Sequence, residues 1–176
     1  VSDGRGAGAV AREMLTDQTG QFNLYAQSHA LLIGNINYQH WGRLPAIKNE
    51  LDQVAAMLSK QGFMVHQLWD LNANKLRTGL REFLNDYGAG KSNRNNRLLV
   101  FYSGHGATRK GWMGDDGYII PVDSPQQTTD ENGFLDKALS MDDIVNWSKK
   151  VSTKHILFLF DSCFSGSILE SKKSGD

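Results

Sequence analysis

Short apolar runs alternate along this chain with stretches whose apolar residues recur at helical spacing. Four runs have the length of strands: residues 29–34, 63–68, 98–102 and 155–160. The second run alternates in polarity, whereas the other three are nearly continuous, as is typical of strands buried on both faces. The helical stretches between the runs end at Gly62 and Gly88. This order predicts an α/β fold: a mostly parallel central sheet flanked by helices in a three-layer sandwich.

Two further elements are predicted before the last strand. The segment from Gly111 to Pro121 contains Gly-Asp-Asp-Gly117 and then an apolar stretch, which indicates a hairpin or an extended excursion. Ser140 is a suitable N-cap residue, and Asp143 follows three residues later. We therefore expect a helix to begin just after Ser140.

Length and charge limit the classes of protein that fit. The 176 residues suit one domain, which we place at 28–176, with an N-terminal tail at 1–27. Nineteen basic residues balance nineteen acidic ones, so no nucleic-acid partner is expected. No apolar run is long enough to span a bilayer, and the start lacks a signal pattern. We expect no membrane association and a cytoplasmic location, although a start at Val1 leaves N-terminal processing open.

Two reactive side chains directly follow predicted strands. His105 lies in Ser103-Gly-His-Gly106, and Cys163 lies in Asp161-Ser-Cys-Phe-Ser-Gly166. Ligands of parallel α/β sheets bind outside the carboxyl ends of the strands. If the two strands are neighbours, both side chains emerge at the same edge.

A cysteine and a histidine at one sheet edge suit nucleophilic catalysis. A thiol attacks carbonyl carbon as thiolate, and a nearby imidazole takes its proton and later protonates the leaving amine. The backbone N–H groups of Gly106 and Cys163 are candidates for an oxyanion hole.

Each motif also has a structural interpretation. A single cysteine is usually a small buried apolar residue. The Ser-Gly-His-Gly loop also suits a tight turn or a phosphate-binding loop, and the cysteine segment suits a plain strand exit. A nucleotide-binding α/β domain is the weaker alternative, because the chain has neither Gly-x-Gly-x-x-Gly nor a Gly-rich loop followed by Lys-Ser/Thr.

The motifs Tyr102-Ser-Gly-His-Gly106 and Asp161-Ser-Cys-Phe-Ser-Gly166 resemble the catalytic motifs of metacaspases, which are caspase-like cysteine peptidases of family C14. Ala30–Asn35 and Asp116–Asp123 are also similar to that family. The resemblance runs from about His29 to the end of the chain. It implies a caspase-like sandwich and a cysteine endopeptidase, with Cys163 as nucleophile and His105 as base.

The resemblance also implies cleavage of protein substrates after Arg or Lys. Asp161 matches an acidic residue of the family's substrate pocket, and Ser103 matches a pocket-lining serine. Glu50 occupies a position where the family usually has Asp. A cationic side chain needs such carboxylate partners. The alternatives are a turn-forming aspartate at 161 and an ordinary solvated helix residue at 50. Paracaspases share this preference, so the pocket does not separate the two branches, and Phe164 departs from the histidine found in many metacaspases.

Calcium is a cofactor that many metacaspases require, although the peptidase chemistry itself needs none. Asp142 and Asp143 fit one part of the family's carboxylate pattern, and Glu170 occupies a position where the family often has Asp. Asp116, or Asp115 in its place, is the candidate for another ligand. Calcium takes six to eight oxygen ligands, so these acids and backbone carbonyls are chemically adequate. Asp142 and Asp143 equally suit the first turn of a helix.

The resemblance covers only the large, p20-like half of the caspase fold. We therefore expect a small, p10-like subunit or C-terminal remainder as a partner of the chain. Lys172-Lys173 suits autocatalytic cleavage by a peptidase with basic specificity. A catalytically silent caspase-like scaffold is the main alternative function, although proteins of that kind typically lose the histidine or the cysteine.

Overall fold

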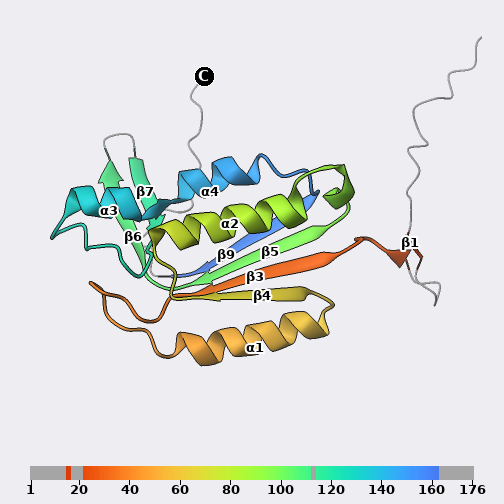
Figure 1. Cartoon of the computed structure of the whole chain (residues 1–176), viewed down its shortest axis with the longest axis horizontal. Helices are drawn as coiled ribbons and strands as arrows, with labels where there is room; N and C mark the ends of the chain where they lie inside the picture. The colour runs from red at the N-terminus through yellow and green to blue at the C-terminus, as the bar shows by residue number, and fades with distance from the viewer. Residues whose placement is uncertain (1–14, 17–21, 112–113, 163–176) are drawn as a thin grey trace, which may run out of the picture.

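The computed structural model describes residues 15–16, 22–111 and 114–162. Four parallel strands form the central sheet in the order β4-β3-β5-β9. Their bounds are Met64–Trp69 for β4, Ser28–Gly34 for β3, Arg97–Ser103 for β5 and His155–Asp161 for β9. Helix α1 (Ile47–Lys60) covers one face, and α2 (Ala73–Gly88) and α4 (Met141–Ser148) cover the other (Figure 1). The predicted three-layer sandwich is confirmed.

A smaller antiparallel unit lies at the end of the sheet where the parallel strands finish (Figure 1). It consists of β6 (Gly106–Gly111), β7 (Gly114–Ile119), β8 (Leu139–Ser140) and the helix α3 (Glu131–Lys137). The predicted excursion is a hairpin of β6 and β7 that begins at Gly106. Two short strands, β1 (Leu15–Thr16) and β2 (Phe22–Asn23), pair with each other, and η1 (Lys91–Asn93) is a 3₁₀ turn.

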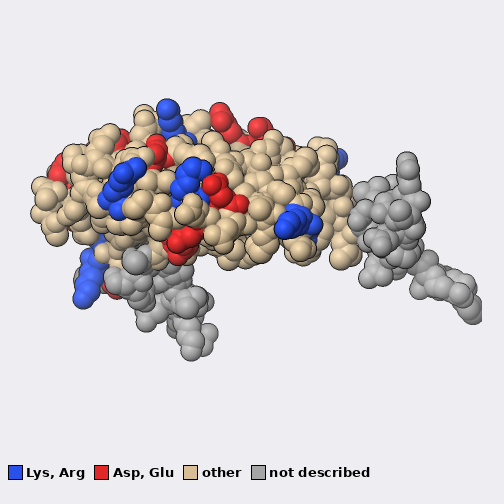
Figure 2. Space-filling model, turned by 90° about the horizontal axis from the view of Figure 1, so that it is seen from below, with Lys and Arg blue, Asp and Glu red and all other residues tan. Residues whose placement is uncertain are grey.

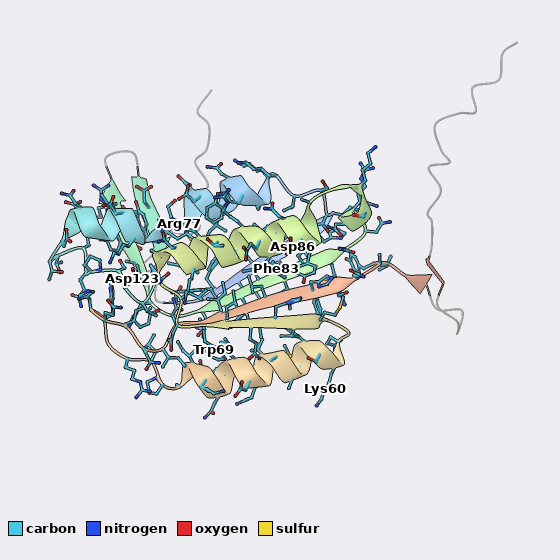
Figure 3. All side chains as sticks on the ribbon, viewed as in Figure 1. Lys60, Trp69, Arg77, Phe83, Asp86 and Asp123 are labelled. Carbon is cyan, nitrogen blue, oxygen red and sulfur yellow. The ribbon has the colours of Figure 1, made fainter. Side chains whose placement is uncertain are left out.

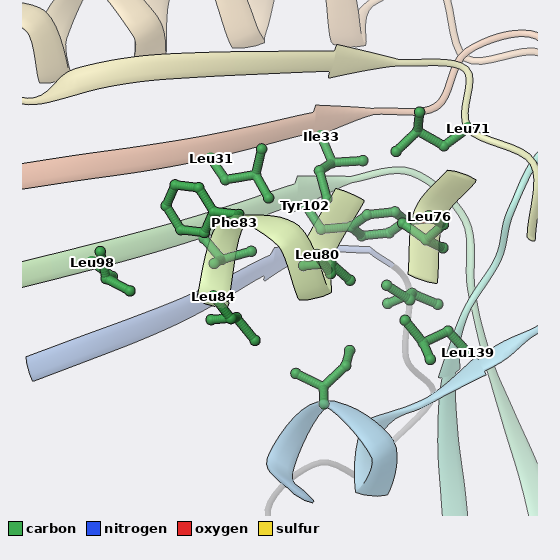
Figure 4. Close-up of a cluster of buried hydrophobic side chains, with 13 residues drawn as sticks. Leu31, Ile33, Leu71, Leu76, Leu80, Phe83, Leu84, Leu98, Tyr102 and Leu139 are labelled. Carbon is green, nitrogen blue, oxygen red and sulfur yellow. The ribbon is translucent and has the colours of Figure 1, made fainter. Parts of the chain in front are cut away.

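The two faces of the sheet carry separate cores. On the α2 side, Leu31 and Ile33 pack with Leu76, Leu80 and other residues of α2 (Figure 4). On the α1 side, the core residues are Ala30, Leu32, Ile36, Ile47, Leu51 and Leu58. Every residue of β3 from His29 to Gly34 is buried, because this strand has helices on both faces. The prediction of a doubly buried strand at 29–34 is therefore confirmed.

Strand β9 differs from its prediction. Its sequence suggests a strand buried on both faces, but half-buried and exposed residues alternate along it. Leu157 and Leu159 are 51% and 41% exposed, and they project on the α1 side of the sheet. The physical reason is that β9 is an edge strand that helix α1 does not reach. The exposed face carried by Leu157 and Leu159 is called the β9 face below.

Local signals fix the ends of the helices. The side chain of Ser140 accepts a hydrogen bond from the N–H of Asp143, which confirms the predicted start of α4.

In α2, Arg77 donates hydrogen bonds to the carbonyl oxygens of Lys137 and Ala138, both at 2.9 Å. Asp123 accepts from the N–H of Ala73 and pairs with the Lys137 ammonium group. These contacts join α2 to the end of α3 (Figure 3) and so attach the antiparallel unit to the sandwich.

Charge is distributed without a single-sign patch on the face shown in Figure 2, where basic and acidic side chains are interspersed among larger uncharged areas. Within the described ranges, no helix has both the length and the apolar character needed to cross a membrane.

Candidate active site

The ends of β5 and β9 are the foundation of the site. The two strands pair in parallel, and Ser103 is the register partner of Asp161. The Ser103 hydroxyl lies 3.5 Å from Oδ2 of Asp161, and the N–H of Gly104 donates to the Asp161 carbonyl oxygen. Ser103 and Asp161 are 58 positions apart in the sequence, and the same number separates His105 from Cys163. Each of these two residues therefore follows its paired strand end by two positions. Cys163 itself lies outside the described residues.

His105 is half-buried and held on several sides by the loop 35–46, which connects β3 to α1. Its Nε2 atom lies 2.8 Å from the carbonyl oxygen of Gly42. Its backbone N–H donates to the Tyr38 hydroxyl at 2.8 Å, and the Tyr38 ring meets the imidazole edge-on with centroids 4.6 Å apart. The Trp41 ring lies 5.3 Å away. Because a carbonyl oxygen only accepts hydrogen bonds, Nε2 carries a proton, and in the neutral imidazole Nδ1 is then the accepting nitrogen.

Asp70 shapes the first part of this loop. Its carboxylate accepts hydrogen bonds from the N–H groups of Ile36 and Asn37, at 2.7 and 2.8 Å, and from the Asn37 side-chain amide. Burial raises the pKa of Asp70, but the hydrogen bonds and the Arg43 charge lower it more, so its pKa lies below the ordinary value. Asp70 adopts a φ of 50°, a left-handed conformation that aspartate tolerates better than most residues.

The loop is also attached, at Asn35 and at Trp41, to the segment that follows β7. The buried side chain of Asn35 donates to the carbonyl oxygen of Ile120 and accepts from the N–H of Leu71. The Trp41 indole N–H donates to the carbonyl oxygen of Ser124 at 3.0 Å. Tyr38 and Trp41 also pack on the apolar cluster formed by Tyr118, Ile120, Phe134 and Ala138. The antiparallel unit thus serves as a platform for the loop that contacts His105.

The predicted substrate-pocket residues are brought together only in part. Ser103 is buried and Asp161 is exposed, and their side chains are in contact. Glu50 lies in the first turn of α1 and is exposed. Its helix begins at the same edge of the sheet (Figure 1), but in the part of the chain that the structure describes no hydrogen bond or ion pair joins Glu50 to Asp161. Gly106, the predicted oxyanion donor, is the first residue of β6.

Three of the four predicted calcium ligands lie among the described residues. Asp116, Asp142 and Asp143 all act on Tyr118: burial raises the pKa of this phenol first, and the three carboxylates raise it further. Each of the three carboxylates therefore lies near Tyr118. However, within 15–16, 22–111 and 114–162 no three carboxylate, histidine or cysteine groups converge to hold a metal ion. Glu170 is outside the described residues. The predicted calcium site therefore stays a prediction.

Sequence patterns did not reveal Tyr38, Trp41, Gly42 or Asp70 as parts of the site. Two weak signals pointed toward them. The segments Ala30–Asn35 and Asp116–Asp123 are both similar to the caspase-like family, and the structure joins them through the hydrogen bond from Asn35 to Ile120. The loop between β3 and α1 also concentrates two aromatic residues near its centre.

Comparisons with known proteins identify the family of the chain. The family model of the peptidase C14 caspase domain matches residues 27–176. The human mucosa-associated lymphoid tissue lymphoma translocation protein 1 is 30% identical over 152 residues, which are 86% of this chain. Its mouse homologue is 29% identical over 147 residues. The chain spans only 16% of the length of either relative. The narrower metacaspase assignment remains a prediction, but the chain belongs to the caspase-domain family of peptidases.

Proposed function

We propose that the chain provides the catalytic half of a cysteine endopeptidase in which Cys163 is the nucleophile and His105 the base. The observation that carries the proposal is the register of β5 and β9. Ser103 pairs with Asp161, and His105 and Cys163 each follow two residues later. Membership of a peptidase family supports the same interpretation.

In the proposed reaction, the Cys163 thiol gives its proton to Nδ1 of His105, the nitrogen left free by the Gly42 contact. The thiolate attacks the scissile carbonyl carbon, and the N–H groups of Gly106 and Cys163 stabilise the resulting oxyanion. Collapse of this intermediate breaks the C–N bond while imidazolium Nδ1–H protonates the leaving amine. Water then attacks the thioester with His105 as base, and the acid product and the thiol are released.

The proposed specificity is for Arg or Lys on the amino side of the cleaved bond. Asp161 ends β9 as an exposed carboxylate, and the hydroxyl of Ser103 lies beside it. A guanidinium group pairs with such a carboxylate through charge-assisted hydrogen bonds. Glu50, at the start of α1, supplies a second negative charge at this edge in the proposal. The calcium requirement remains a prediction, and no step depends on it.

The proposed partner is a small-subunit-like segment that adds to the free side of β9. Support comes from the β9 face, because Leu157 and Leu159 are exposed by 51% and 41%, and within 15–16, 22–111 and 114–162 no strand pairs with the outer edge of β9. Natural proteins seldom leave an apolar edge strand uncovered. The much greater length of the relatives is consistent with additional sequence that supplies such a segment.

Turnover of fluorogenic peptides that end in Arg, Lys or Asp tests this function, with and without calcium. We expect cleavage after Arg or Lys, and loss of cleavage in Cys163→Ala and in His105→Ala. Asp161→Asn is expected to raise KM for the Arg peptide. Asp52→Asn is the matched control, because Asp52 makes an exposed i,i+4 ion pair with Lys48 on α1.

Three outcomes contradict parts of the proposal. Turnover that survives Cys163→Ala rejects the nucleophile, and a preference for Asp rejects the basic pocket. Absence of turnover in every condition, together with an unreactive Cys163 thiol, favours the silent scaffold.

A further inference from the structure

Two tyrosines from different elements meet beneath the backbone of His105. Tyr38 comes from the loop between β3 and α1, and Tyr102 is the last residue but one of β5. Their hydroxyl oxygens are 3.3 Å apart. Tyr102 is fully buried, with its ring among the leucines of the α2-side core (Figure 4). Neither tyrosine has a role in the reaction described above.

The number of available protons fixes the direction of each hydrogen bond. The His105 N–H donates to the Tyr38 hydroxyl at 2.8 Å. The Tyr102 hydroxyl lies 2.9 Å from the carbonyl oxygens of His105 and Ile120, and carbonyl oxygens only accept. Its single proton is therefore directed at these carbonyls. The contact between the two hydroxyls must then be a hydrogen bond from Tyr38 to Tyr102.

These bonds close a ring around His105. It runs from the His105 N–H through the hydroxyl of Tyr38 and then that of Tyr102 back to the His105 carbonyl oxygen. Both phenols must be neutral to donate, and burial raises the pKa of Tyr38 and that of Tyr102. Hydrogen bonds in a buried chain polarise and strengthen one another. The closed ring therefore restrains His105 more firmly than the same hydrogen bonds would if each formed alone.

The glycine before His105 is required by this ring. A Cβ atom on Gly104 would lie 2.5 Å from the Tyr38 hydroxyl and 2.6 Å from that of Tyr102. The Ser-Gly-His-Gly loop and the tyrosine pair are thus built against each other. The Tyr38 ring also contacts the imidazole itself, so one residue restrains both the backbone and the ring of His105.

We propose that Tyr38 is a positioning residue that, with Tyr102, holds His105 in its working orientation through this closed ring of hydrogen bonds. The proposal rests on the proposed role of His105 as base, and it adds a residue to that site. A small misplacement of a catalytic group lowers the rate of the chemical step more than the affinity for substrate.

The test compares Tyr38→Phe with Tyr25→Phe. Tyr38→Phe removes a hydroxyl from the ring of hydrogen bonds and keeps the aromatic contact with the His105 imidazole. Tyr25→Phe removes an oxygen from a tyrosine that packs on His155 and Arg97 instead. We expect Tyr38→Phe to lower kcat for the Arg peptide by roughly tenfold to a hundredfold with KM changed less than about twofold. Tyr25→Phe is expected to match wild type.

A second measurement needs no peptide substrate. The chain has one cysteine, so the rate of alkylation by iodoacetamide reports the reactivity of Cys163 alone, and thiolate reacts much faster than thiol. We expect Tyr38→Phe to slow this alkylation, and Tyr102→Phe to act in the same way. The double variant should be alkylated only slightly more slowly than either single variant, because both substitutions break the same ring of hydrogen bonds.

The outcomes separate this proposal from the proposed function. If wild type cleaves no peptide, the peptidase assignment fails, and alkylation still decides the role of Tyr38. Equal alkylation rates in wild type and Tyr38→Phe overturn the proposal, as does a kcat within twofold of the Tyr25→Phe control. Should one of the two ring variants not fold, as judged by circular dichroism, the other supplies the same measurements.

Discussion

The Nε2 atom of His105 lies 2.8 Å from the carbonyl oxygen of Gly42, in the loop between β3 and α1. This contact selects the tautomer protonated at Nε2 and leaves Nδ1 as the acceptor. The orienting group is a backbone carbonyl, so the orientation of the base depends on the path of the loop rather than on one side chain. Contacts that fix this path therefore bear on the proposed catalysis.

Trp41 precedes Gly42 in the sequence and joins the loop to the segment that follows β7. Its indole N–H donates to the buried Ser124 segment, and its ring lies beside His105. In Trp41→Phe a smaller aromatic ring remains, but the Ser124 carbonyl oxygen loses its hydrogen-bond donor. This loss lowers the free energy of unfolding by about 1–3 kcal/mol. We expect kcat for the Arg peptide to fall by about tenfold as Gly42 shifts. Trp147→Phe, on α4, is the control, and equal kcat values for the two variants would contradict this role.

Gly104→Ala is expected to damage the site more than the fold. The added Cβ would lie 2.5–2.6 Å from two tyrosine hydroxyls, so His105 must move. Overpacking of this kind costs roughly 1–3 kcal/mol, and we expect turnover to be nearly lost. Gly79→Ala in α2 is the matched control, because the added atom meets only the end of the Leu68 side chain. Urea denaturation and peptide turnover of the two variants are the measurements. Turnover of Gly104→Ala above half the wild-type value would be incompatible with a tightly packed ring.

The fold was largely predictable because its core strands carry their signal locally. The continuous apolar run of β3 matches a strand with helices on both faces. The same type of run misled at β9, since Leu157 and Leu159 are apolar whether or not a neighbour covers them. Helix α3 was missed because its seven residues bury only Phe134, which is too little to form a periodic pattern.

The site was predictable only where its chemistry is in side chains at strand ends. His105 follows β5 directly, which a pattern of strand and glycine can reveal. Gly42 acts through a backbone carbonyl, and its distance from His105 depends on the folded path of the loop. Tyr38 becomes informative only once its partner Tyr102 is known. Contacts of this type join residues far apart in sequence and leave no periodic trace.

The β9 face gives a prediction about the proposed partner segment. Replacing Leu157 and Leu159 together by Asp should cost this part of the fold little, because both side chains are more than 40% exposed. If a further segment covers them, two buried unpaired charges would oppose its docking strongly. We expect kcat/KM to fall more than tenfold in protein that carries the proposed partner segment, with an unchanged circular dichroism spectrum. Met57→Asp, at 56% exposed on α1, is the control. Wild-type kcat/KM in the double variant would show that the face stays open during turnover.

The His29–His66 pair predicts how stability depends on pH. Nδ1 of His29 and Nε2 of His66 are 3.3 Å apart, and His29 is only 3% exposed. Burial and then the His66 charge lower the pKa of His29 below its ordinary 6.5. The unfolded chain therefore binds a proton that the folded chain resists, so the free energy of unfolding should decrease as pH falls below about 6.5 toward the folded pKa. Asp70, whose pKa is lowered from 3.8, changes the free energy of unfolding only in more acidic solution, so it does not affect this pH range.

Urea midpoints at pH 7.5 and 5.5 measure the effect. His29→Gln should reduce the difference between them, whereas His40→Gln, at an exposed loop position, should keep it. An equal difference in wild type and His29→Gln would show that protonation of His29 is not coupled to folding.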